Sequence, residues 1–243
     1  MTGVMNRRDL VRGAMAAGAA LALPRRSFAQ VLETPLGAPA PATALPLVGA
    51  PAIAPPVAPL PPPLPTTIIP NPAYDRKVLE IAARERAKAG AALWRGDVVG
   101  VADFARPSTL PRLHFANLEA GTIRSFYVAH GRGSDPEHSG FLQSFSNRDG
   151  SLATSRGGYL TAEWYHGKYG TSIRLLGLDA DNSNALNRAL VIHPAWYADP
   201  QVIQRQGKLG RSEGCFAMAP AEFNEALWHL SGGRLLFADR IEL

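Results

Sequence analysis

The chain has 243 residues, enough for one sizeable domain or two small ones, and its 46% hydrophobic content is ordinary for a globular protein. The formal net charge is +5, but residues 1–29 contain five arginines and one aspartate. Subtracting these from the chain's 25 basic and 20 acidic residues leaves 20 basic and 19 acidic groups for the remainder. A nucleic-acid-binding protein needs a basic surface on its folded part, so no nucleic-acid partner is predicted.

Residues 1–29 are typical of an export signal. The pair Arg7-Arg8 precedes a short, mildly apolar run of alanine and glycine, and the segment ends in small residues around Phe28 that suit a signal peptidase. The apolar run is shorter than the ~20 residues that a membrane span requires. Paired arginines favour the twin-arginine route, and an ordinary secretory signal is the alternative. Either route predicts cleavage after Ala29 and a location in the periplasm or cell envelope.

A proline-rich segment follows. Residues 31–72 contain 14 prolines, and proline fixes φ and removes a backbone donor, so residues 30–70 cannot form a helix or a sheet interior. We expect an extended, semi-rigid linker, with a segment of no particular role as the alternative. The folded domain is predicted to comprise residues 71–243.

The predicted domain begins with a helix over 72–90, because Asn71 is a good N-cap, Pro72 suits the first helical position and Gly90 is a plausible stop. Short runs rich in apolar residues, bounded by proline, glycine or asparagine, predict strands. They cover 98–104, 113–118, 123–129, 172–178, 189–193 and 234–238. Helices are predicted at 182–188, 199–206 and 220–230. Strands with irregularly interspersed helices indicate the α+β class, with no membrane span beyond the signal.

Cys215 is the chain's only cysteine, so no disulfide can form within the chain. A leftover cysteine in an exported protein is a candidate reactive thiol, and a buried apolar cysteine is the alternative. Gly214 allows a substrate carbonyl to approach the backbone. The N–H groups of Gly214 and Cys215 are therefore candidate oxyanion donors, with the Ser212 hydroxyl close by.

A thiol nucleophile needs a base. His193 ends an apolar strand just before Pro194, where it can face a cleft, and His130 also ends a strand and is its rival. No two histidines show the i, i+4 spacing typical of a zinc site, so we predict no metal site and no cofactor.

At these residues the sequence resembles the L,D-transpeptidases of the YkuD type, within the branch labelled the murein L,D-transpeptidase catalytic domain family. In that family a histidine at a strand end is followed some twenty residues later by Ser-x-Gly-Cys. Here His193 precedes Cys215 by 22 positions, and Ser212-Glu213-Gly214-Cys215 fits. The resemblance covers roughly residues 98–239. It extends over the segments 101–104, 107–109, 127–131, 145–147, 170–178 and 209–212.

The resemblance implies a β-rich fold and a cysteine acyl-enzyme that acts on peptidoglycan stem peptides. Cys215 would attack a meso-diaminopimelate–D-alanine bond, with His193 as base and a backbone carbonyl, here that of Pro194, orienting it. The acyl group would pass to an amine, giving a 3–3 cross-link, or to water, giving an L,D-carboxypeptidase. A non-catalytic wall-binding module is the third reading, supported by Pro194 and Glu213, which depart from the family pattern.

The resemblance also gives three secondary candidates. Arg211 would pair with a stem carboxylate as a bidentate donor, or lie on the surface as an ordinary arginine. His130 and Ser146 would line or support the cleft. The residues leave the oligomeric state open.

Overall fold

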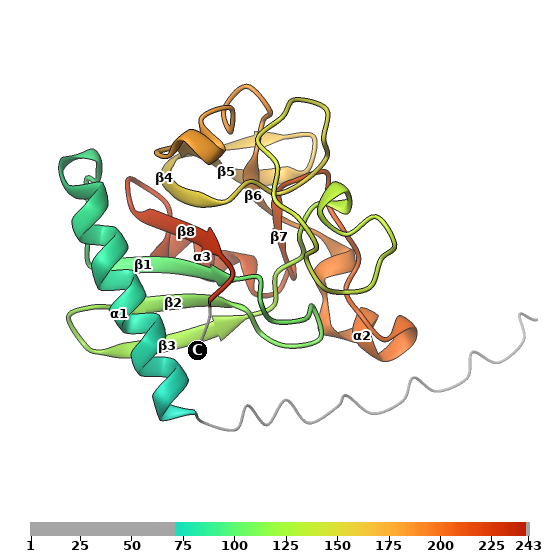
Figure 1. The fold of residues 1–243 in the computed structure, drawn as a ribbon, viewed down its shortest axis with the longest axis horizontal. Coiled ribbons are helices and arrows are strands. Elements are labelled where there is room, and N and C mark those ends of the chain that lie inside the picture. The colour runs from blue at the N-terminus through green and yellow to red at the C-terminus, as the bar shows by residue number, and fades with distance from the viewer. Residues whose placement is uncertain (1–70, 242–243) are drawn as a thin grey trace, which may run out of the picture. The chain divides into compact units, whose positions relative to one another are not determined.

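The computed structural model describes residues 71–241 (Figure 1). The predicted signal and linker lie outside the described residues. No helix within residues 71–241 has the length and apolar character needed to cross a membrane. The helices are α1 Pro72–Ala89, α2 Pro200–Gln206 and α3 Phe223–His229. The strands are β1 Val98–Asp103, β2 Leu113–Asn117, β3 Thr122–Phe126, β4 Gly157–Gly167, β5 Gly170–Gly177, β6 Val191–Pro194, β7 Phe216–Met218 and β8 Leu235–Asp239.

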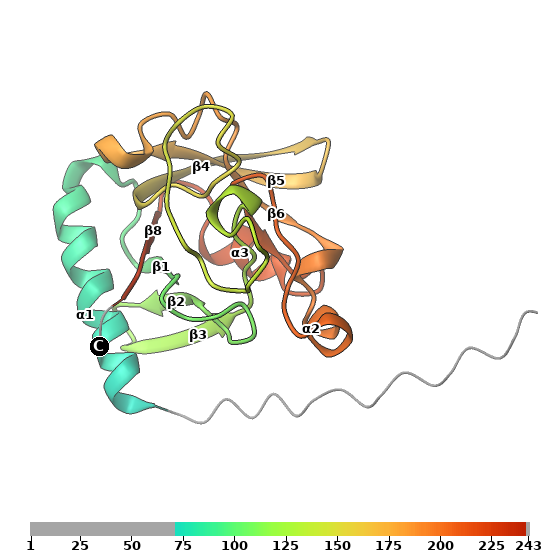
Figure 2. The same cartoon turned by 45° about the vertical axis from the view of Figure 1, so that its right-hand side comes forward.

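The strands form one eight-stranded mixed sheet in the order β3-β2-β1-β8-β4-β5-β6-β7. Two neighbouring pairs are parallel, β1 with β8 and β6 with β7, and the others are antiparallel. The β4–β5 hairpin extends past the rest of the sheet (Figure 2). A β-rich sheet with three helices confirms the predicted α+β class.

Helix α1 covers one face of the sheet beside β1, β2 and β8 (Figure 1). The Asn71 side chain accepts the Tyr74 N–H at 3.1 Å and caps the helix, and Gly90 ends it, as predicted. Val78 and Ile81 pack against Val99 and Phe237 of the sheet. This apolar face, rather than helix propensity alone, holds α1 in place.

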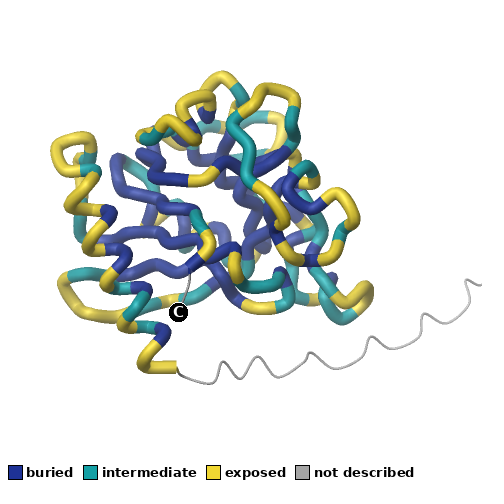
Figure 3. Tube along the Cα trace, in the orientation of Figure 1, coloured by how far each residue is buried: buried dark blue, intermediate teal, exposed yellow. Residues whose placement is uncertain are grey.

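The opposite face carries the main core, to which α3 contributes. Alternation along β1 and β8 divides their side chains between the two faces. In β1, Val99 packs on the α1 side and Ala102 lies in the main core. In β8, Phe237 packs on the α1 side and Leu236 lies in the main core. Figure 3 shows the resulting continuous buried trace through the sheet.

Two strands have no counterpart in the predictions. The outer half of β4 is largely exposed, and its pairing with β5 shifts between Thr161 and Trp164, so the alternation that marks a strand is interrupted. The strand β7 has only three residues, all buried. So short a run carries no periodicity that distinguishes strand from loop.

The helix predicted at 182–188 is wrong. A short 3₁₀ helix, Ala180–Asn182, ends at the start of this range, and residues 183–189 form turns. The Asn182 side chain accepts the Asp179 N–H at 2.9 Å and donates to the Gly158 carbonyl at 2.7 Å. Asparagine competes in this way with helical backbone bonds. The predicted helix at 220–230 begins later, at Phe223.

Pro194 was expected to break its strand, but it lies within β6 opposite Met218. The ladder continues because the next residue, Ala195, donates its N–H to the Met218 carbonyl at 2.8 Å. The strand predicted over 123–129 ends at Phe126, and Ala129 forms a separate bridge with Ala217.

Candidate active site

Cys215 and His193 lie on adjoining segments at one end of the sheet. In the parallel β6–β7 pair, Ile192 faces Phe216 and His193 faces Ala217. Cys215 immediately precedes β7, so it lies within one step of this ladder. In the resting arrangement its sulfur is directed to the Ala189 carbonyl oxygen, 3.7 Å away, and not to His193. Catalytic hydrogen bonds are often long or unformed without substrate.

The Cys215 thiol is buried, with a relative exposure of 7%. Burial raises the pKa of Cys215 because the thiolate loses its hydration. The Val191 N–H and the positive charge of Arg188 act in the opposite direction. Glu213 also raises the pKa, although its carboxylate is largely exposed and pairs with Arg132 at 3.1 Å. The resting cysteine is therefore a neutral thiol near neutral pH.

The imidazole of His193 is buried between aromatic rings. Its Nδ1 lies 3.1 Å from the Pro194 carbonyl oxygen. A carbonyl can only accept, so Nδ1 carries the proton and Nε2 keeps its lone pair. The Tyr169 ring stacks on the imidazole with centroids 4.9 Å apart, and Tyr197 meets its edge at 6.5 Å. Burial lowers the pKa of His193, which keeps the ring neutral.

Gly214 has a backbone conformation that favours glycine, with φ at +116°. A Cβ there would lie 2.8 Å from the Ala153 carbonyl oxygen. Gly131 approaches just as closely, because a Cβ on it would lie 2.6 Å from the Gly214 Cα. Two glycines thus allow two backbone segments to touch beside the thiol.

The predicted oxyanion donors are partly engaged in the resting structure. The Gly214 N–H donates to the Ser212 hydroxyl oxygen at 3.2 Å, and that hydroxyl donates to the Cys215 carbonyl at 2.6 Å. Ser212 therefore closes the turn that presents the cysteine. Its hydroxyl is not free to meet a substrate unless this turn opens.

The three secondary candidates lie around a loop over residues 131–156, and none of their hydrogen bonds involves Cys215. His130 is fully buried with Nδ1 2.7 Å from Arg112, and burial lowers its pKa to about 3. Arg211 donates to the carbonyls of Asp135 and Pro136. Such contacts hold His130 inside the domain and tie Arg211 to the loop, and the supporting role of His130 stays a prediction.

Ser146 acts through its backbone. Its carbonyl accepts from Arg188 at 2.7 Å and from Ser155 at 2.9 Å, and its N–H donates to Thr154 at 3.0 Å. The structure therefore gives Ser146 a place in the loop that flanks Gly214, without a direct contact to the thiol.

Comparison with known families decides the identity of this domain. Residues 71–238 match the family described as L,D-transpeptidase catalytic domain. The chain belongs to this family. No curated protein matches the sequence.

Two solved structures resemble the chain at low sequence identity. An L,D-transpeptidase from Mycobacterium smegmatis is 15% identical, with a TM-score of 0.36 over 59% of this chain and 58% of that one. The helical cell shape determining protein Pgp2 from Campylobacter jejuni is 14% identical, with a TM-score of 0.41 over 67% of this chain and 56% of that one. The chain thus spans less than two thirds of these structures.

Arg188 is a site residue of this L,D-transpeptidase domain that the sequence did not reveal. Its guanidinium donates to the Ser146 and Ala153 carbonyls and to the Ser151 and Ser155 hydroxyls. A Cβ on Gly214 would lie 3.3 Å from its Nη2. No sequence motif includes Arg188, and the incorrectly predicted helix over 182–188 did not indicate that its side chain would lie near the site.

Tyr169 was also not identified from the sequence. It lies at the turn between β4 and β5, far along the chain from His193, and only the pairing of β5 with β6 brings the two rings together. Within residues 71–241 no three histidine, cysteine, aspartate or glutamate side chains are grouped as a metal-ligand set.

Proposed function

We propose that this chain is an exported peptidoglycan L,D-transpeptidase that uses Cys215 as its nucleophile and His193 as its base. The observation that carries the proposal is the position of His193 on β6 beside β7, the strand that Cys215 immediately precedes, with His193 held by the Pro194 carbonyl. Membership of the L,D-transpeptidase family supports a stem peptide as the substrate.

The chemistry follows from two neutral partners. The raised pKa of Cys215 and the lowered pKa of His193 disfavour a resting thiolate–imidazolium pair. His193 Nε2 would take the thiol proton as the sulfur attacks the carbonyl carbon of the diaminopimelate–D-alanine bond. The S–C bond forms, the C–N bond breaks, and His193 returns the proton to the leaving D-alanine amine. The Cys215 thiol must first leave the Ala189 carbonyl.

The second half of the reaction regenerates the thiol. A side-chain amine of another stem attacks the thioester, His193 accepts its proton, and the proton returns to sulfur, giving a 3–3 cross-link. The Cys215 N–H is the proposed oxyanion donor, joined by that of Gly214 when the substrate oxygen displaces the Ser212 hydroxyl. Each such donor contributes about 10²–10³-fold to a rate.

The departures that favoured a non-catalytic module leave the proposed machinery intact. Pro194 lacks an N–H but its carbonyl still accepts from His193. Glu213 pairs with Arg132 at the surface. Both observations support an enzyme over a wall-binding module.

The proposal is tested with the chain without its predicted signal, residues 30–243, and purified tetrapeptide muropeptides analysed by mass spectrometry. Release of D-alanine with cross-linked dimers is expected, and release with tripeptide alone would assign an L,D-carboxypeptidase instead. Cys215→Ala and His193→Ala should abolish D-alanine release, while His229→Ala, an exposed histidine on α3, should not. A wild-type protein without any product, or an active Cys215→Ala variant, would overturn the assignment.

Export by the twin-arginine route to the periplasm is a separate proposal, based on Arg7 and Arg8. Replacing both with lysine should leave the protein in the cytoplasm if that route is used. Continued export of the double variant would indicate an ordinary secretory signal.

A further inference from the structure

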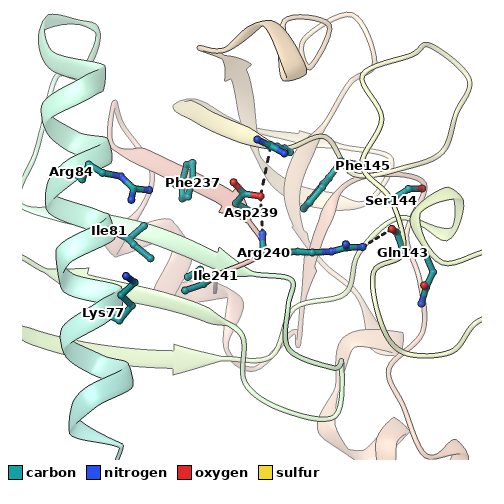
Figure 4. Close-up of a pocket in the computed structure, with 11 residues that line it drawn as sticks. Lys77, Ile81, Arg84, Gln143, Ser144, Phe145, Phe237, Asp239, Arg240 and Ile241 are labelled. Carbon is teal, nitrogen blue, oxygen red and sulfur yellow. Dashed lines mark hydrogen bonds and ion pairs between the residues drawn. The ribbon is translucent and has the colours of Figure 1, made fainter. Parts of the chain in front are cut away.

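A cavity of about 640 Å³ lies between α1 and the C-terminal end of β8 (Figure 4). Its size is within the range of ligand sites, roughly 300–1,000 Å³. Residues 143–145 form its far wall, and neither Cys215 nor His193 lines it. We call it the α1–β8 cavity.

Positive charge is concentrated here. Lys77 and Arg84 of α1 line the cavity. Two further arginines line it, Arg156 immediately before β4 and Arg240 immediately after β8. The lining contains one carboxylate, that of Asp239. Four cations and one anion give a formal net charge of +3 in the lining. Residues 30–243 together carry only +1, as the difference between 20 basic and 19 acidic groups. The cavity is therefore far more basic than the chain around it.

Much of this charge is not neutralised within the domain. Arg240 donates from Nη2 to the carbonyls of Leu142 and Gln143, which carry no formal charge. Arg156 lies 3.7 Å from the Asp181 carboxylate and 3.8 Å from that of Asp239, and it is 53% exposed. Lys77 forms none of the ion pairs among residues 71–241. Arg84 has the shortest ion pair of the four cations, with Glu85 at 2.7 Å.

The floor of the α1–β8 cavity is apolar. Ile81, Phe237 and Ile241 form it and are buried at 5–6% exposure, and Phe145 stands on the opposite wall (Figure 4). A ligand that fills the cavity therefore needs aliphatic groups between its charges. The guanidinium of arginine is suited to carboxylates because it presents paired donors.

The apolar floor and Asp239 together favour an acidic peptide over a phosphate. Its carboxylate lies 3.8 Å from the Arg156 guanidinium and accepts the backbone N–H of Arg240 at 2.8 Å (Figure 4). A carboxylate there repels either anion, but it can accept an N–H, which a peptide backbone supplies and a phosphate lacks. We propose that the α1–β8 cavity binds an acidic peptide, with its carboxylates on Lys77, Arg156 and Arg240 and its aliphatic side chains on Ile81 and Phe237.

The proposal is tested by fluorescence anisotropy with residues 30–243 and a fluorescein-labelled pentapeptide of alternating glutamate and leucine. The matched peptide carries glutamine in place of glutamate. We expect the acidic peptide to bind, the glutamine peptide to bind at least about tenfold more weakly, and the affinity to fall as NaCl rises from roughly 0.05 to 0.5 M.

Charge reversal locates the site. Lys77→Glu and Arg156→Glu together should weaken binding about tenfold or more. Arg76→Glu, an exposed position next to Lys77 on α1 that does not line the cavity, should change it by no more than about twofold. Lys77→Gln with Arg156→Gln provides a milder pair if the reversals unfold the domain.

Three results would overturn the proposal. They are unchanged binding in the Lys77/Arg156 variants, loss of binding after Cys215 is alkylated, and polyphosphate that binds more tightly than the acidic peptide. The second would move the peptide to the cysteine site, and the third would assign a phosphate polymer. The binding assay requires no catalysis. A protein that binds the peptide but releases no D-alanine would therefore contradict the proposed function and leave the peptide site standing.

Discussion

The Tyr169 ring lies against the His193 ring, with centroids 4.9 Å apart and planes inclined by 29°. Tyr169 is thus one of the groups that bury the imidazole, and burial is the main cause of its lowered pKa. Removing the tyrosine should let water reach His193 and raise its pKa. If His193 stays protonated up to a higher pH, it cannot act as a base there, so the enzyme loses activity at the acid end of its pH profile.

We therefore predict that Tyr169→Ala moves the acid limb of the kcat/KM profile to higher pH. Activity near pH 6.5 should fall by about tenfold, which is less than the ~10²–10⁴-fold that a general base contributes. Tyr169→Phe keeps the stacked ring and should behave as wild type. NMR titration of the imidazole measures the pKa directly. An unmoved His193 titration in Tyr169→Ala would reject a positioning role.

Gly214→Ala should destabilise the domain and inactivate it. The substitution combines a strained φ, which costs about 1–3 kcal/mol, with a contact of 2.8 Å to the Ala153 carbonyl. Gly150→Ala is the matched control, because its φ is also positive at +69° but nothing lies within 4 Å of the added Cβ. Urea unfolding compares the two. Equal losses of stability would show that the contact at Gly214 is easily relieved.

Arg188→Gln should loosen the loop over residues 146–155 and slow the reaction of Cys215. The variant loses charge-assisted bonds to two carbonyls, worth about 2 kcal/mol in stability, and removes a charge that lowers the pKa of Cys215. Hydrogen exchange of the loop and iodoacetamide alkylation across pH measure the two effects. Arg148→Gln, an exposed arginine on the same loop, should change neither, and a silent Arg188→Gln would refute the role.

Acid should destabilise the domain through its buried histidines. Burial lowers the pKa of His114 and of His130 to about 3, from the ordinary value of 6.5. Below pH 6.5 the unfolded chain binds these protons while the folded domain does not, so stability falls as the pH drops from 6.5 towards 3.

His114→Gln removes one such group and should flatten the dependence of Tm on pH over that range, even if it lowers Tm at pH 7. His229→Gln replaces an exposed histidine and serves as the control. Identical pH dependence in both variants would mean that His114 contributes nothing to the acid response.

The sequence by itself determined the parts whose signal is local. Asn71, Pro72 and Gly90 fixed the ends of α1, because capping depends on residues adjacent in the chain. Most strands of the sheet were predicted within two or three residues from short apolar runs. The motif around Cys215, with His193 22 positions earlier, was sufficient for the family that the comparison then confirmed.

Only the tertiary structure decided what depends on distant segments. The strands β4 and β7 follow from their partners, since a bulge and a three-residue length remove any periodic signal. Tyr169 reaches the site through the pairing of β5 with β6, and Arg188 through its hydrogen bonds to the loop over residues 146–155. The resting thiol is directed to Ala189, beside the turn that Ser212 closes. The α1–β8 cavity likewise brings together cations from three segments, each more than seventy residues from the next. The order of residues along the chain does not reveal such neighbours, because the burial and charge of a site depend on distant segments that only folding brings together.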